Sequence, residues 1–338
     1  MSSPYRSPWW LPGGHAQTIY AAALGRLRPA QSRGPALRRE RWDTPDGDFV
    51  DVDLLDAPPG SPADTPLVVM FHGLEGSSRS HYARAMMRAL AARGWRGALP
   101  HFRGCSGEPN RLPRAYHSGD SAEIGFLLQR LHALATASSP AAPLCASGVS
   151  LGGNALLKWL GEQRGAAREL VAACAAVSPP LDLAAVGDHL ARGGNRVYTR
   201  MFLATMKDKS AAKLARFPGL FDLAAMQRAS NLREFDDVVT APLHGFRDVD
   251  DYWTRASSKQ YLASIEVPTL LLSARNDPFL PERALPGPSQ VSASVQLELL
   301  PHGGHVGFVS GGFPGNLDWL PSRLLAFFDS QSGRQSGG

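Results

Sequence analysis

The sequence predicts an α/β fold in which helices cover a mostly parallel central sheet. Short runs that are apolar at every position alternate along the chain with segments of helical periodicity. A strand that is apolar throughout is buried on both faces, as in a parallel sheet that helices cover. The chain has 338 residues, 43% of them hydrophobic, which is enough for one large α/β domain or two smaller ones.

The chain opens with an aromatic segment, residues 1–35, which we expect to pack on the core. Two strands follow at 36–42 and 48–55, and the turn Thr44-Pro45-Asp46-Gly47 joins them into a hairpin. After a loop rich in proline and glycine, the run LVVMF at 67–71 predicts the first buried strand.

Helices and strands then alternate. A helix is predicted over 81–94, where apolar residues recur every four positions, and another within 120–136, where leucines mark one face. The same criteria predict strands at 95–102, 143–149, 170–177, 267–274 and 294–300, and helices at 154–163 and 319–328. This alternation is typical of right-handed βαβ units in one sheet.

One interval interrupts the alternation. No buried-strand run occurs between Ser178 and about Ile265, and helical patches such as 196–217 occur instead. We therefore expect a core formed by 36–180 and 266–330, a helical lid insertion at 181–265 and a disordered tail at 331–338. The apolar side chains of the insertion suit either an acyl chain or an ordinary cap core. Trp9, Trp10 and Leu11 suit an acyl pocket, a membrane-surface contact or an anchor for the N-terminus.

The composition argues against several classes of protein. The net charge is +5, but the arginines are dispersed and no nucleic-acid-binding pattern occurs, so we expect no nucleic-acid partner. Cys105, Cys145 and Cys174 have no CxxC spacing and cannot all pair, which indicates a reducing compartment. Without a secretory signal or a long apolar stretch, the sequence predicts a cytoplasmic protein.

The stretch GVSLGGN at 148–154 contains the pattern G-x-S-x-G. Ser150 falls between the end of a predicted strand and the start of a helix, where the backbone must turn sharply under strain. Gly148 and Gly152 leave room for neighbouring chain at such an elbow. The turn aims the serine hydroxyl at the N-terminus of the following helix, which favours developing negative charge. Ser150 is therefore the candidate nucleophile.

A serine hydroxyl needs a base, and the base needs a group that fixes its tautomer. Asp277 follows the predicted strand 267–274, and His305 lies in the loop after 294–300, so both emerge at carboxyl ends of strands. His302 competes with His305, which we favour because glycines flank it. The acidic alternatives Asp248, Asp250 and Asp251 lie in the insertion and suit a solvated face.

The oxyanion hole requires two backbone donors. One is the N–H of Leu151, directly after the serine, and the other is predicted in the loop HGLEGSS, where Gly73 allows close approach and Leu74 is the candidate. Ser106, in the similar stretch GCSG, follows a different strand and has Glu108 where the second glycine belongs. We expect no metal and no cofactor, since the histidines are scattered along the chain and H-E-x-x-H does not occur.

Several longer motifs accompany the serine motif. They are GGHAQT (13–18), TPDGDFVDVD (44–53), FHGLEGS (71–77), HFRGCSGEPNR (101–111), YHSGD (116–120), GVSLGGN (148–154), REFDD (233–237), NDPF (276–279) and HGGHVGF (302–308). With them the chain resembles the YheT-like branch of the α/β-hydrolase superfamily, the bacterial relatives of the eukaryotic ABHD lipid hydrolases.

The resemblance implies an α/β-hydrolase fold with Ser150, Asp277 and His305 as catalytic triad. It also implies hydrolysis of carboxylic esters, with short- or medium-chain esters or monoacylglycerol-like lipids as substrates. A thioesterase or acyltransferase on the same triad is one alternative, although no H-x-x-x-x-D motif occurs. A non-catalytic relative that binds acyl ligands is another. Dehalogenases and epoxide hydrolases of this fold need an aspartate nucleophile, so the serine argues against them. Peptidases and carbon–carbon hydrolases use the same triad and remain open.

Overall fold

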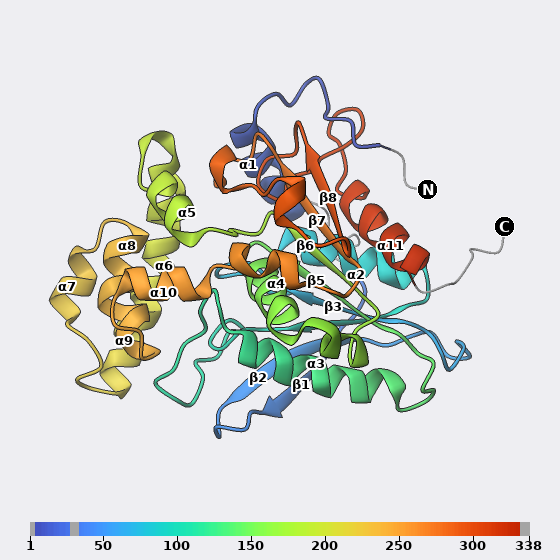
Figure 1. Ribbon diagram of the computed structural model, residues 1–338, viewed down its shortest axis with the longest axis horizontal. Helices are drawn as coiled ribbons and strands as arrows, with labels where there is room; N and C mark the ends of the chain where they lie inside the picture. Colours follow the sequence, from blue (N-terminus) through green and yellow to red (C-terminus); the bar gives the residue numbers. More distant parts are fainter. Residues whose placement is uncertain (1–3, 28–33, 332–338) are drawn as a thin grey trace.

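The computed structural model describes residues 4–27 and 34–331 (Figure 1). A single sheet of eight strands runs through them, in the order β1-β2-β4-β3-β5-β6-β7-β8. β1 and β2 pair antiparallel, as do β2 and β4, and every other neighbouring pair is parallel. The predicted α/β fold with a mostly parallel sheet is confirmed. The predicted tail lies outside the described residues, apart from Gln331.

All eight predicted strands are present. They are β1 (Arg38–Asp43), β2 (Phe49–Leu55), β3 (Leu67–Phe71), β4 (Arg96–Pro100), β5 (Leu144–Val149), β6 (Ala173–Val177), β7 (Thr269–Ala274) and β8 (Val295–Leu300). β6 begins three residues later than the apolar run predicts, because the short 3₁₀ helix η2 (Arg164–Glu169) and its cap occupy the start of that run.

Helices cover both faces of the sheet. α2 (His81–Ala92) and α11 (Trp319–Gln331) pack on one face, and α3 (Ser121–Thr136) and α4 (Leu151–Gln163) on the other. Alternate residues of β3 serve the two cores: Val69 and Phe71 face α3 and α4, whereas Val68 and Met70 face α2. Burial on both faces explains why these strands lack an alternating pattern.

The opening hairpin brings charges into the edge of the core. β2 is buried along its whole length although it contains two aspartates. Asp51 lies opposite Arg41 and Asp53 opposite Arg39, and each aspartate accepts two hydrogen bonds from its arginine. These cross-strand pairs compensate the charge that burial would otherwise leave unpaired.

The insertion, residues 181–265, connects β6 to β7. It contains α5 (Leu183–Leu190), η3 (Gly193–Asn195), α6 (Arg196–Arg216), α7 (Leu223–Arg228), α8 (Leu232–Phe235), the π-helical turn η4 (Asp236–Thr240), α9 (Ala241–Leu243), α10 (Val249–Ala256) and η5 (Lys259–Ser264). Figure 1 shows α5 to α10 gathered on one side of the molecule, away from α11 and the two termini. Short 3₁₀ helices, η6 (Glu282–Ala284) and η7 (Pro288–Gln290), follow β7.

The N-terminal segment contains a helix that the sequence analysis did not predict, α1 (Gly14–Leu27), which packs against α2. Ahead of it, Leu11 is buried with α1, and the ring of Trp10 contacts that of Tyr20. Trp9 is 90% exposed, so it does not anchor this segment.

Candidate active site

Ser150 occupies a strained turn between β5 and α4. Its backbone has φ 52° and ψ −120°, a conformation that costs a residue with a side chain about 1–3 kcal/mol. Gly148 and Gly152, which flank the serine, are required because a side chain at either position would clash with neighbouring backbone atoms. A Cβ on Gly148 would lie 2.5 Å from the Gly152 carbonyl oxygen, and a Cβ on Gly152 would lie 2.6 Å from the Phe71 carbonyl oxygen. Only glycine at both positions lets the chain pass this closely.

The structure brings Ser150, His305 and Asp277 together. His305 Nε2 lies 3.0 Å from Ser150 Oγ, and His305 Nδ1 lies 2.8 Å from Asp277 Oδ2. The side chain of Asp277 is fully buried and that of His305 is 10% exposed. One imidazole therefore bridges a hydroxyl at the strand–helix turn and a carboxylate that water does not reach.

The local structure after β7 fixes both the acid and the imidazole. Asp277 Oδ1 accepts a hydrogen bond from the Phe279 N–H, which leaves Oδ2 for His305. The ring of Phe279 stacks on that of His305, with centroids 4.0 Å apart. The imidazole thus has a fixed plane as well as a fixed partner. Sequence reasoning missed Phe279, although the motif NDPF contains it.

The loop that carries His305 is held by the N-terminal helix. Thr18 Oγ1 accepts from the His305 N–H, and Gln17 Oε1 accepts from the Gly303 N–H. Asn276 joins the network, since its side chain donates to Gln17 and accepts from the Gly304 N–H. The motifs GGHAQT, NDPF and HGGHVGF therefore meet in one hydrogen-bonded cluster. In the sequence, the only sign of these contacts is that all three motifs belong to the set that carries the family resemblance.

The loop after β3 lies against the serine. The Gly76 N–H donates to the Gly73 carbonyl, and Glu75 has φ 55°, the pattern of a type II turn. A Cβ on Gly73 would lie 3.2 Å from the Cβ of Ser150. His72 supports the turn from inside: it contacts the Gly73 carbonyl through Nδ1 and accepts from a backbone N–H through Nε2. Burial lowers the pKa of His72 to about 3, so the ring is neutral.

The backbone amides of Leu74 and Leu151, beside the serine, differ from their neighbours in their hydrogen bonding. The N–H groups of Gly73 and Glu75 each donate to a tyrosine hydroxyl. Within residues 4–27 and 34–331, by contrast, the amides of Leu74 and Leu151 donate to no other group. Both are thus available to bind a substrate oxygen.

The competing residues lie elsewhere. His302 is exposed and contacts neither Ser150 nor Asp277. The three acidic residues of the insertion serve it locally: Asp248 caps α10, Asp250 pairs with Arg233, and Asp251 pairs with Arg247.

The loop after β4 is structural. Its Arg103, which the sequence suggested as a partner for a carboxylate, binds Asp46, Asp48 and Glu123. Burial raises the pKa of the neighbouring Cys105 thiol to about 12, so this thiol is not a nucleophile at neutral pH. The loop therefore offers no nucleophile through Cys105, and its residues 103, 104 and 107–110 line the cavity in front of Ser150.

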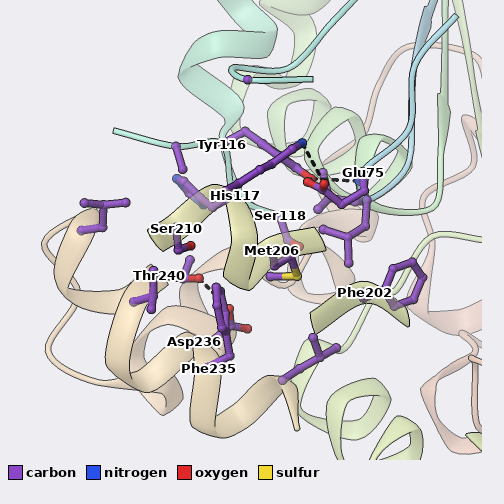
Figure 2. A pocket seen from close by; sticks show the side chains of 18 of the residues that line it. Glu75, Tyr116, His117, Ser118, Phe202, Met206, Ser210, Phe235, Asp236 and Thr240 are labelled. Atoms are coloured by element: carbon purple, nitrogen blue, oxygen red, sulfur yellow. Dashed lines mark hydrogen bonds and ion pairs between the residues drawn. The ribbon is translucent and has the colours of Figure 1, made fainter. Parts of the chain in front are cut away.

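A cavity of about 560 Å³ opens in front of Ser150 and His305. Figure 2 shows one wall formed by Glu75, Tyr116, His117 and Ser118, and the other by side chains of the insertion, among them Phe202, Met206 and Phe235. Such a volume holds a ligand of drug size, and most of its lining is apolar. The insertion therefore forms much of the wall of the cavity in front of the serine.

The described residues contain neither a cluster of metal-ligating side chains nor a membrane-spanning helix. No group of three His, Cys, Asp or Glu side chains within residues 4–27 and 34–331 is arranged to hold a metal ion. In the same part of the chain, no helix has the length and apolar character needed to cross a membrane.

Comparison with known proteins identifies the family. The family model described as "alpha/beta hydrolase fold" matches residues 66–312. "Putative esterase YheT" of Escherichia coli (strain K12) is 41% identical over 84% of this chain and 82% of its own length. "Phospholipase ABHD3" of Mus musculus is 30% identical over 93% of this chain and 75% of its own.

A solved structure shares the fold. Est1E from Butyrivibrio proteoclasticus, with ferulic acid bound, superposes with a TM-score of 0.56 over 87% of this chain and all of its own, at 17% identity. The family model and the sequence relatives both identify the family of this chain. The chain therefore belongs to the YheT-like branch of the α/β-hydrolase superfamily.

Proposed function

We propose that the protein hydrolyses carboxylic esters through a Ser150–His305–Asp277 triad and an acyl-enzyme intermediate. The observation that carries the proposal is the placement of His305, whose two ring nitrogens lie 3.0 Å from Ser150 Oγ and 2.8 Å from Asp277 Oδ2. The relatives support the class of reaction, since their names include an esterase and a phospholipase.

The first half of the reaction forms the acyl-enzyme. Ser150 Oγ attacks the ester carbonyl carbon while His305 Nε2 takes its proton, and Asp277 stabilises the imidazolium through Nδ1–H. The carbonyl oxygen becomes an oxyanion, which the N–H groups of Leu74 and Leu151 bind. The carbon–oxygen bond of the alcohol then breaks, and the alcohol leaves with the proton from Nε2.

The second half returns the enzyme to its starting state. A water molecule gives its proton to His305 Nε2 and attacks the acyl carbon, and the same two amides bind the second oxyanion. The bond to Ser150 Oγ breaks, the serine recovers its proton from His305, and the carboxylic acid departs. No step needs a cofactor.

The cavity supports an apolar acyl group as the recognised part of the substrate. Phe202, Met206 and Phe235 of the insertion face it, and it continues to Ser150. Short- and medium-chain esters and monoacylglycerol-like lipids are the substrates that suit this lining and this volume. We propose that the insertion acts as the lid over that acyl group.

A series of p-nitrophenyl esters tests the proposal, with Ser150→Ala as the blank. We expect kcat/KM to rise from acetate to a medium chain length, because each added methylene buries more apolar surface, and to fall when the chain outgrows the cavity. Ser150→Ala is expected to lose at least about 10⁴-fold in turnover. Turnover that survives in Ser150→Ala contradicts the proposal. A matched thioester series separates esterase from thioesterase activity.

A further inference from the structure

Tyr116 makes two hydrogen bonds to Glu75, the residue after Leu74, whose N–H is the proposed oxyanion donor. Its hydroxyl accepts a hydrogen bond from the Glu75 N–H at 2.9 Å and donates one to Glu75 Oε1 at 2.8 Å. A single phenol therefore holds both the backbone and the side chain of one residue. Burial raises the pKa of Tyr116 well above its ordinary value, so the hydroxyl keeps the proton that it donates.

Glu75 needs this support because its backbone is strained. The third position of a type II turn requires a positive φ and favours glycine, yet a glutamate occupies it with φ 55°. A side chain tolerates that conformation when surrounding contacts impose it. Here Tyr116 holds Glu75 Oε1, and Lys209 of α6 pairs with Oε2 at 2.7 Å. Both carboxylate oxygens are thus engaged.

A second tyrosine holds the other end of the turn. Tyr82, at the start of α2, accepts a hydrogen bond from the Gly73 N–H at 2.9 Å. The amides on both sides of Leu74 are therefore each fixed by a phenol from a different element, α2 and the loop before α3. Neither tyrosine contacts the Leu74 amide itself, which is left without an internal acceptor.

We propose that Tyr116, together with Tyr82, is a positioning residue for catalysis: the two hydroxyls fix the turn so that the Leu74 N–H is aimed at the oxyanion. The inference rests on the proposed function. A donor of this kind lowers the barrier only if it is already oriented before charge develops, since reorganisation would consume the gain. Removing one oxyanion-hole donor costs an enzyme about 10²–10³ in kcat, and loosening one costs part of that.

Tyr116→Phe and Tyr82→Phe test the inference. Each removes one hydroxyl and keeps the ring, which for Tyr116 stacks on Phe102. Tyr5→Phe is the matched control, since it removes a partly buried hydroxyl that donates to the Val309 carbonyl, outside the turn. For all three we would measure kcat and KM on a p-nitrophenyl ester, the Ki of a trifluoromethyl ketone of the same chain length, and Tm. The adduct of the ketone with Ser150 carries an oxyanion in the same position as the tetrahedral intermediate of ester hydrolysis.

Tyr116→Phe is expected to lower kcat by about tenfold to a hundredfold, to leave KM within about twofold, and to weaken the ketone by a matching factor. Tyr82→Phe should act in the same direction, and it serves alone if Tyr116→Phe does not fold. The inference is overturned if Tyr116→Phe and Tyr82→Phe each have a kcat and a Ki within about twofold of those of Tyr5→Phe, whatever the change in Tm. Failure of the proposed function is a different result: it appears as turnover that survives Ser150→Ala.

Discussion

At the scale of single residues, the site depends on the separate hydrogen bonds of the two carboxylate oxygens of Asp277. Oδ1 accepts from the Phe279 N–H, and Oδ2 faces His305 Nδ1. The buried carboxylate therefore selects the tautomer in which Nδ1 carries the proton and Nε2 is free to receive one from Ser150. The stacked ring of Phe279 keeps the imidazole in that plane.

The use of both oxygens gives a sharp prediction for Asp277→Asn. The amide oxygen would keep the Phe279 N–H, and the NH₂ group would then face His305 Nδ1. That contact forces the proton onto Nε2, the wrong tautomer for a base. We expect kcat to fall by about 10³–10⁴, as when a triad carboxylate is replaced by an amide, while the fold is retained.

Steady-state kinetics with far-ultraviolet circular dichroism checks this expectation. Ser178→Ala is a suitable control, because Ser178 is buried directly after the end of β6 but its hydroxyl has no hydrogen-bond partner in the described residues. A normal kcat in Asp277→Asn would move the acid role to another residue.

At the scale of elements, the turn from β5 into α4 shows why the serine motif carries its glycines. Gly152 lies against the backbone of the neighbouring strand β3, with the carbonyl oxygens of Phe71 and His72 both 2.6 Å from where a Cβ would be. A backbone carbonyl in a sheet cannot move aside as a flexible side chain can. The same turn places Leu151 at the first position of α4, where helix N–H groups favour negative charge.

Gly152→Ala is therefore expected to lower the free energy of unfolding by about 1–3 kcal/mol, the usual cost of overpacking a dense site. Gly194→Ala is the matched control, since a Cβ at Gly194 meets nothing within 4 Å and should change stability by no more than about 0.5 kcal/mol. Urea denaturation measures both variants. Equal stabilities for the two would mean that the elbow relaxes more readily than its contacts imply.

Elements differ in how far the sequence predicts them. The central strands are predictable because burial on both faces demands unbroken apolar runs, as in LVVMF and LCASGV. The charged hairpin strands β1 and β2 are predictable from the turn that joins them. α1 was not predicted because its apolar residues do not share one buried face: Ala21 and Leu24 are buried, whereas Ile19 is exposed. The short helices of the insertion were predicted only in part, since their faces pack on one another and not on the sheet.

The site divides in the same way. The sequence predicts Ser150, Asp277 and His305 as candidates because each follows an apolar strand, and parallel strands end at one edge of the sheet. The side chains that orient them come from distant positions, such as Gln17, whose Oε1 accepts hydrogen bonds from the Asn276 side chain and from the Gly303 N–H. Hydrogen bonds between segments so far apart leave no local pattern in one sequence.

At the scale of the whole molecule, the insertion adds a buried acid whose titration couples pH to stability. Asp236 accepts hydrogen bonds from Thr240 and Trp253, and burial raises its pKa to about 6. Because the folded state holds the proton more tightly than the unfolded state, the contribution of Asp236 to stability is fully present below about pH 4. It is lost as the pH rises through 6.

Asp236→Asn should therefore stabilise the protein at alkaline pH. The side-chain carbonyl of the asparagine can accept from Trp253, and its NH₂ can donate to Thr240. We expect the free energy of unfolding to rise by as much as about 3 kcal/mol at pH 8, and by less at pH 5, since two pKa units correspond to about that energy. Urea denaturation at the two pH values checks it. A gain that is equal at both pH values, or a loss at pH 8, would rule out this titration.

The most direct test of the account is to find which side chain is the nucleophile. Intact protein would be treated with a fluorophosphonate and digested, and the modified peptide sequenced by mass spectrometry. The account predicts one adduct per chain, on Ser150 and not on Ser106, with loss of labelling in Ser150→Ala and in His305→Ala. An adduct on another residue, or a folded wild-type protein that takes up no label, would contradict it.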